Sequence, residues 1–179
     1  MQAFWKPAAL ALTFAAAFTA QAQMPKQKPI KVEFKLSDGS PAGTAWLRSL
    51  PMGGVKIKLE LKGLPPGPHG FHIHEHAVCT GPDFKSAGGH FNPTGKHHGF
   101  ENPLGHHAGD TPSNLVADKD GKVSETFDLS DVTLDPLAPN SLFAGGGTSL
   151  VVHAGADDEK SDPAGNAGPR IACAVVLQP

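Results

Sequence analysis

Apolar and polar residues alternate strictly in two short segments of this chain, residues 30–36 and 55–61. Successive side chains of a strand point to opposite faces, so this alternation predicts strands with one buried face. Residues 44–50 lie between turn-forming clusters rich in Gly, Pro and Ser, and they are predicted to form a third strand.

Less regular patterns predict five further strands, at residues 69–76, 114–118, 123–129, 148–154 and 170–177. The last two are apolar runs rich in β-branched residues, which is typical of buried strands. Lys-Asp-Gly at 119–121 is a hairpin turn signal between two of the strands. Helical periodicity is absent from the sequence outside the N-terminal region, so we expect an all-β fold.

Two segments rich in Gly, Pro and polar residues, 79–112 and 155–169, are predicted to be long loops. Long irregular loops are uncommon in compact domains and are usually functional. Eight strands with two such loops favour an antiparallel sandwich or barrel that carries a site on its loops.

The N-terminal residues have the pattern of a secretory signal. Lys6 is the only charged residue before Lys26, residues 8–20 are uncharged, and Ala-Gln-Ala at 20–22 is a small-x-small cleavage site. This predicts a signal peptide over residues 1–22, too short for a membrane-spanning helix. No cysteine follows it directly, so we expect no lipid or membrane anchor, and an exported protein that is periplasmic or secreted.

After the signal peptide we expect a flexible polar leader, residues 23–29, and a single domain, residues 30–179. The only cysteines are Cys79 and Cys173. Export favours a disulfide between them, although two buried free thiols are the alternative. The formal net charge of −2 argues against nucleic-acid binding.

Histidines recur at every second position in GFHIHEH, residues 70–76. On a strand, His72 and His74 share one face with their Cα atoms about 6–7 Å apart, so both rings can reach one metal ion. The apolar residues beside them face the core. His76 lies about 13 Å from His72 along an extended strand. We therefore expect His76, like His69, to be solvated.

A second histidine-rich segment, residues 88–110, holds five histidines and ends in Asp110. His107 precedes Asp110 by three residues, so one turn can bring both to an ion. Neutral imidazoles with one carboxylate suit Zn²⁺. His153, at the end of a buried strand, could complete the first cluster. A loose histidine-rich metal scavenger is the alternative.

Six motifs occur in order along the chain: GFHIHEH, GGHFNP, KHHG, HHAGD, LVVHAGADD and GNAGPRIAC. Together they resemble the copper/zinc superoxide dismutases in their exported bacterial form, from roughly Ile30 to Leu177. The resemblance implies an eight-stranded Greek-key β-barrel with a metal-binding loop and an active-site loop.

The resemblance also implies an enzyme that converts superoxide to molecular oxygen and hydrogen peroxide, for antioxidant defence in the cell envelope. Its copper would cycle between Cu(II) and Cu(I), and a structural zinc would share a bridging histidine with it. The cofactors would be one copper ion and one zinc ion per subunit.

Each family ligand has a match in this chain. The implied copper ligands are His72, His74, His90 and His153. The implied zinc ligands are His90, His98, His107 and Asp110. In the family the second zinc histidine directly precedes a glycine, which selects His98 over His97, and the H-x-G-D motif leaves out His106.

Other matched residues support the metal ions. Asp157 matches a carboxylate that hydrogen-bonds a copper histidine and a zinc histidine at once, here His72 and His98. Arg170 matches the active-site arginine, a permanent cation for an anionic substrate. Cys79 and Cys173 match the disulfide of the family.

A non-catalytic copper- or zinc-holding protein on the same scaffold is the alternative to an enzyme. The complete ligand sets and Arg170 favour the enzyme. A homodimer could form, but His76 and Ala77 replace residues of the eukaryotic dimer contact, so the oligomeric state stays open.

Overall fold

The computed structural model describes residues 1–2 and 28–179. The expected signal peptide and leader lie almost wholly outside the described residues, so both stay predictions. Within the described residues, no helix has the length and apolar character needed to cross a membrane.

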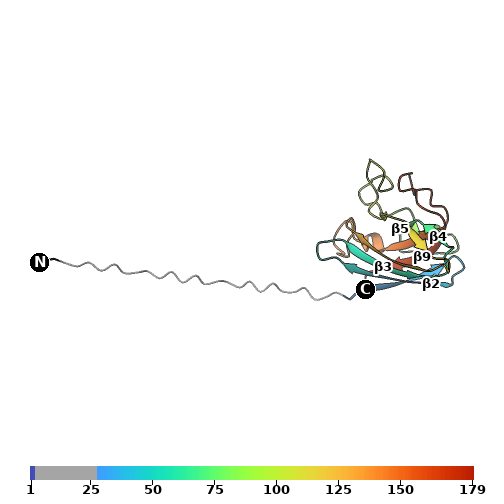
Figure 1. Ribbon diagram of the computed structural model, residues 1–179, viewed down its shortest axis with the longest axis horizontal. Helices are drawn as coiled ribbons and strands as arrows, with labels where there is room; N and C mark the ends of the chain where they lie inside the picture. The colour runs from blue at the N-terminus through green and yellow to red at the C-terminus, as the bar shows by residue number, and fades with distance from the viewer. Residues whose placement is uncertain (3–27) are drawn as a thin grey trace.

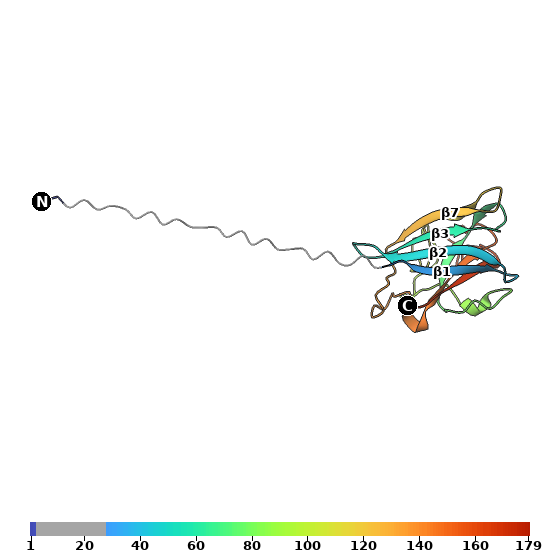
Figure 2. The ribbon, with the colours of Figure 1, turned by 90° about the horizontal axis from the view of Figure 1, so that it is seen from below.

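Antiparallel strands make up the fold, which confirms the all-β prediction. Seven form one curled sheet in the order β5-β8-β9-β1-β2-β3-β7, and β4 pairs with β6 in a second, two-stranded sheet. Figure 2 shows β1, β2, β3 and β7 side by side on one face. The bounds are β1 (Ile30–Leu36), β2 (Pro41–Ser49), β3 (Val55–Leu61), β4 (Gly67–His69), β5 (Phe71–His74), β6 (Leu115–Ala117), β7 (Val123–Leu129), β8 (Thr148–His153) and β9 (Arg170–Val176), with short 3-10 turns η1 (Lys85–Ala87) and η2 (Ala144–Gly146).

The alternating sequence pattern sets which face of each strand is buried. In β3 the residues Val55, Ile57, Leu59 and Leu61 are buried, and the charged residues between them point outward. Burying one such side chain contributes about 1.5–3 kcal/mol. The core lies between the two halves of the curled sheet, as the pattern predicts.

One predicted strand, residues 69–76, is two strands in the structure. It breaks at Gly70, whose N–H donates to Gly155 O at 2.8 Å and whose carbonyl accepts from His153 N at 2.8 Å. β4 therefore pairs with β6, whereas β5 pairs with β8. A Cβ at Gly70 would lie 2.8 Å from Ala167 Cβ, so the close approach of these segments favours glycine.

The predicted hairpin at residues 119–121 is only partly present. The turn closes through Gly121 N donating to Asp118 O at 2.9 Å. The two strands it joins do not pair with each other, because β6 pairs with β4 and β7 pairs with β3.

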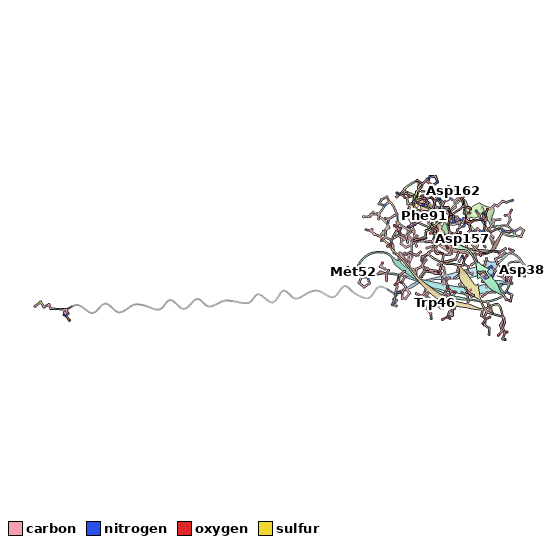
Figure 3. The ribbon with its side chains drawn as sticks, turned by 45° about the horizontal axis from the view of Figure 1, so that its top comes forward. Asp38, Trp46, Met52, Phe91, Asp157 and Asp162 are labelled. Carbon is pink, nitrogen blue, oxygen red and sulfur yellow. A yellow bond between two sulfur atoms is a disulfide. The ribbon has the colours of Figure 1, made fainter. Side chains whose placement is uncertain are left out.

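The Cys79–Cys173 disulfide is formed, as predicted. It anchors the segment after β5 to β9, where Cys173 is buried beside Val151. Long loops rise above β4 and β5 in Figure 1. Figure 3 places Asp157 and Asp162 of the 154–169 loop together with Phe91, on the side of the molecule away from Trp46.

Candidate metal centre

Four buried histidines converge where β5, β8 and the loop after β5 meet. Their ligand atoms lie within 4.8 Å of one another, and the residues are His72, His74, His90 and His153. Antiparallel pairing sets His72 of β5 opposite Val151 of β8, which brings β5 next to the end of β8 where His153 stands. An isolated bridge between His74 and His90 adds the fourth ring.

Hydrogen bonds fix which ring nitrogen faces the centre. His74 Nδ1–H donates to Gly88 O at 3.0 Å, and His153 Nδ1–H donates to Gly168 O at 3.0 Å. Their Nε2 atoms face each other at 3.4 Å. His72 has the opposite arrangement, because its Nε2–H donates to Asp157 Oδ2 at 2.6 Å.

Two ring nitrogens of this cluster, His72 Nδ1 and His90 Nε2, are buried without a hydrogen-bond partner among the described residues. A buried polar atom without a partner is costly and calls for an explanation such as an ion. A set of four imidazole nitrogens suits copper. The four residues therefore fit a copper ion.

A second cluster surrounds Asp110 Oδ1. The Nδ1 atoms of His90, His98 and His107 lie 2.8, 3.1 and 3.2 Å from this oxygen. His90 Nδ1 and His107 Nδ1 are 3.3 Å apart. Tetrahedral zinc with bonds of about 2.0 Å has ligand–ligand edges of about 3.3 Å, so these four atoms fit one zinc ion.

His72 also lies close to this second cluster. Its ligand atoms and those of His90, His98 and Asp110 lie within 4.8 Å of one another, because its ring stacks on His90 with centroids 4.0 Å apart. The Nε2–H of His72 is hydrogen-bonded to Asp157, however, so this nitrogen does not face the second cluster as a free ligand. His107 has its Nδ1 directly beside Asp110 and His90, so His107 fits the zinc set better.

His90 belongs to both clusters. Its Nδ1 faces Asp110, and its Nε2 is the unpartnered atom beside the other three histidines. The second oxygen of Asp110 accepts the backbone N–H of Gly99 at 2.9 Å and of His107 at 3.0 Å. The carboxylate is thus held by the loop that also carries the histidines.

Asp157 links the two clusters by hydrogen bonds to one histidine of each. Its Oδ2 accepts from His72 and its Oδ1 accepts from His98 Nε2–H at 3.0 Å, which are the two contacts that the resemblance implies. The Asn114 side chain holds the backbone of Asp157. Its Oδ1 accepts from Asp157 N–H at 2.6 Å, and its Nδ2 donates to Asp157 O at 3.0 Å. Sequence reasoning missed Asn114, because a single Asn directly before β6 gives no spacing signal.

Burial keeps all four copper-type histidines neutral, which is the form that binds metals, and it lowers the pKa of His74 well below its usual value. It lowers the pKa of His72 and of His153 to about 4, and that of His90 to about 3. Burial alone would also lower the pKa of His98, but its hydrogen bonds to Asp110 and Asp157 raise it to about 10. The site around His98 therefore favours a cation.

Both buried carboxylates are ionised. Burial would raise the pKa of Asp110 and of Asp157, but hydrogen bonds from the surrounding histidines hold both well below the usual range. Two negative charges thus lie on the zinc side of the centre. They offset the charge of a bound divalent cation.

Arg170, the first residue of β9, lies beside the copper-type cluster. Its Nη1 donates to Phe84 O at 2.8 Å, and its Nη2 donates to Gly88 O at 2.5 Å. His74 donates to the same Gly88 carbonyl. Burial lowers the pKa of Arg170, but an arginine keeps its charge at neutral pH.

The remaining histidines lie outside both clusters. His97 is exposed and pairs with Asp162 at 2.7 Å, and His106 stacks on Phe100 with ring centroids 3.8 Å apart. His76 is exposed, as predicted.

The prediction of a solvated His69 is wrong. This residue is only 2% exposed, and its ring lies between the carbonyls of His153 and Pro65 at 2.8 and 2.7 Å. The β4–β6 pairing turns its side chain inward, which a pattern read as one continuous strand does not anticipate.

Comparisons with known proteins agree with this site. Residues 41–176 match the family model described as copper/zinc superoxide dismutase. A copper/zinc superoxide dismutase of Aquifex aeolicus is 58% identical over 124 residues, which cover 69% of this chain and 72% of the relative. One of Caulobacter vibrioides is 42% identical over 144 residues, which cover 79% of this chain and 82% of the relative.

Solved structures show the same fold. A double mutant of a SOD-like protein from Bacillus subtilis matches with a TM-score of 0.80 and 40% identity, over 83% of this chain and 97% of that one. The Cu/Zn superoxide dismutase from Brucella abortus matches with a TM-score of 0.67 and 32% identity, over 83% of this chain and 99% of that one. A Greek-key β-barrel with two adjoining metal-ligand clusters is the class that fold and site define. The chain belongs to the copper/zinc superoxide dismutase family.

Proposed function

We propose that this protein is a superoxide dismutase that converts two superoxide ions and two protons to molecular oxygen and hydrogen peroxide. The observation that carries the proposal is His90, whose two nitrogens face the two ligand clusters. Its Nε2 is buried and has no hydrogen-bond partner in the part of the chain that the structure describes. One copper and one zinc per chain are the cofactors. A bound copper ion supplies one-electron chemistry by alternating between Cu(II) and Cu(I).

The contacts of the site residues support a role for each of them. Copper would be held by His72 Nδ1, His74 Nε2, His90 Nε2 and His153 Nε2. Zinc would be held by His90 Nδ1, His98 Nδ1, His107 Nδ1 and Asp110 Oδ1. Asp157 fixes the rings of His72 and His98, which sets the nitrogen that each presents.

Two residues act on the substrate. Arg170 offers a fixed positive charge to an anionic diatomic molecule, and its guanidinium is held by two backbone carbonyls. His90 Nε2 can hold either the copper ion or a proton, but not both at once, because Nδ1 stays in the zinc set and Nε2 has no hydrogen-bond partner among the described residues. The proton that peroxide needs therefore has a defined donor atom.

Metal analysis combined with a superoxide-consumption assay tests this function. The purified protein, loaded with both metals, should hold one copper and one zinc per chain and consume superoxide. A preparation that holds both metals but consumes no superoxide would favour the second candidate, a non-catalytic metal-holding protein on the same scaffold.

The site of action is part of the same proposal. The signal-like N-terminal pattern supports export to the periplasm or beyond, and the Cys79–Cys173 disulfide suits an oxidising compartment. Cell fractionation and N-terminal sequencing test this, with a mature start near Gln23 expected. A homodimer, and the lack of a membrane anchor or nucleic-acid partner, stay predictions, which sedimentation and binding assays can check.

A further inference from the structure

One peptide unit, between Gly88 and Gly89, links two groups of the proposed site. Its carbonyl oxygen accepts hydrogen bonds from His74 Nδ1–H at 3.0 Å and from Arg170 Nη2–H at 2.5 Å. A copper ligand and the substrate-binding cation are therefore oriented by the same acceptor. Any rotation of this peptide would move both.

The N–H of the same peptide unit is held by Glu75. Gly89 N donates to Glu75 Oε1 at 2.9 Å. Glu75 directly follows His74, and its own backbone N–H donates to Gly89 O at 3.0 Å. The Glu75 carboxylate thus accepts a hydrogen bond from the N–H of this peptide unit, while the carbonyl of the same unit accepts from His74 and Arg170.

The sequence makes room for this contact. Gly88 has φ +77, and a Cβ there would lie 2.6 Å from Glu75 Oε1 and 2.7 Å from Glu75 Cγ. A side chain at position 88 would therefore collide with Glu75, besides being strained in this conformation. The Glu75 side chain therefore occupies the space that a side chain at position 88 would need.

We propose that Glu75 is a positioning residue for both His74 and Arg170, acting through the Gly88–Gly89 peptide unit. The inference rests on the proposed function, in which His74 binds copper and Arg170 receives the anion. A charged acceptor makes a stronger hydrogen bond than a neutral one, and it polarises the peptide so that the carbonyl becomes a better acceptor. The Glu75 side chain is 48% exposed, which limits the effect to a modest size.

A simpler role for Glu75 predicts the opposite sign. As a mere surface anion near Arg170, it would repel an approaching anion, and its removal would strengthen anion binding. As a positioning residue, its removal loosens the peptide and weakens anion binding. The two roles can therefore be separated by measuring anion affinity.

The experiment compares Glu75→Ala, Glu75→Gln and the wild type, each loaded with copper and zinc. Azide serves as the anionic probe and is titrated by the visible absorption of copper, and the copper EPR spectrum is recorded in parallel. Gln keeps an acceptor oxygen for Gly89 N–H but loses the charge. Asp83→Asn is the charge control, because the Asp83 carboxylate acts on Arg170 but does not contact the Gly88–Gly89 peptide.

We expect Glu75→Ala to bind azide about two- to tenfold more weakly than Glu75→Gln, the range that one net hydrogen bond supports. Its EPR spectrum should change, while those of Glu75→Gln and Asp83→Asn stay close to the wild type. Weaker copper uptake by the Ala variant alone, with zinc content intact, would count in favour as well. Azide binding in Glu75→Ala equal to or tighter than in Glu75→Gln, with an unchanged EPR spectrum, would overturn the inference and leave the function standing. A wild type that takes up no copper would overturn both.

Discussion

Gly165 lies so close to Asp157 that a Cβ at position 165 would be 1.6 Å from Asp157 Oδ1. The same Cβ would be 2.7 Å from His98 Nε2. These two atoms form the hydrogen bond that ties the zinc cluster to Asp157. Only a residue without a side chain fits over this bond.

Gly165→Ala should therefore break the Asp157–His98 contact and lower zinc affinity by about 10–100-fold, as is usual when a residue that orients a metal ligand is lost. Isothermal titration of the metal-free protein with zinc measures the effect. Gly95→Ala is the matched control. Gly95 has φ +64, against +60 at Gly165, and it meets no atom within 4 Å, so it adds the backbone strain without the collision. Equal losses in both variants would mean that strain alone is responsible.

His153→Ala should abolish superoxide turnover and leave zinc bound. His153 faces only the copper-type cluster, at 3.4 Å from His74 Nε2, and it has no contact with Asp110. Metal analysis of the variant alongside the dismutation assay checks both halves of the prediction. Undiminished turnover with copper retained would remove His153 from the site.

The adjacent histidine pairs of the loop should behave differently when one member is changed. His98→Ala and His107→Ala should each lower zinc affinity, because each places Nδ1 within 3.2 Å of Asp110 Oδ1. His97→Ala and His106→Ala should leave it nearly unchanged, because those rings contact Asp162 and Phe100 instead. The four variants are compared by competition with a zinc chelator, and the reverse pattern would contradict the assigned ligands.

Zinc removal should open the loop over residues 88–110. All four zinc-type ligands come from this loop, so bound zinc closes it on itself, and Asp157 ties it to the neighbouring loop. A ligand that binds only the folded state stabilises it by mass action. The zinc-free protein should melt at a lower temperature and be cut by protease within 88–110, while the β-strands stay protected. Unchanged protease resistance would contradict this coupling.

Much of the fold follows from local patterns. The strict alternation of β1 and β3 predicts both strands and their buried faces, because neighbouring residues differ strongly in hydrophobicity. The break between β4 and β5 was missed, because it depends on Gly70 meeting residues 153–155 and 167 from far along the chain. A contact between segments this far apart in the chain cannot be predicted from the local sequence pattern.

The site divides in the same way. His72 and His74 are found from their spacing, since one strand sets their geometry. The choice of His98 over His97 required the family motif. Sequence alone does not show which of two adjacent loop side chains points toward the ion. Asn114 binds the backbone of Asp157 through its side chain, and the Gly88–Gly89 peptide acts through its own backbone atoms. No residue pattern displays contacts of this kind.

Arg170 yields the last prediction, which concerns electrostatics. Arg170→Glu replaces the cation that faces the anionic substrate with an anion. Two unit charges about 5 Å apart interact by about 3 kcal/mol at an effective dielectric constant near 20, so the loss of rate could exceed tenfold before solvent screening. The Glu variant also loses both donors to Phe84 O and Gly88 O. Arg170→Lys keeps the charge but not the two-pronged donor, so its loss should be smaller.

The acidic 154–169 loop opposes Arg170 less than its composition suggests. Asp157 is buried against His72 and His98, and Asp162 is paired with His97. Burial and the neighbouring Asp157 raise the pKa of Glu159 to about 7, so part of its charge is absent at neutral pH. Asp158 and Asp162 stay ionised at the surface, since hydrogen bonds lower the pKa of both, whereas Arg170 lies beside the copper-type cluster and should attract the substrate there. Added salt should slow the wild type more than Arg170→Glu, because salt screens an attraction in the wild type and a repulsion in the variant.

Stopped-flow superoxide decay across ionic strengths, with metal content held equal, measures this difference. A metal-replete Arg170→Glu variant that works at the wild-type rate would show that Arg170 does not serve the substrate.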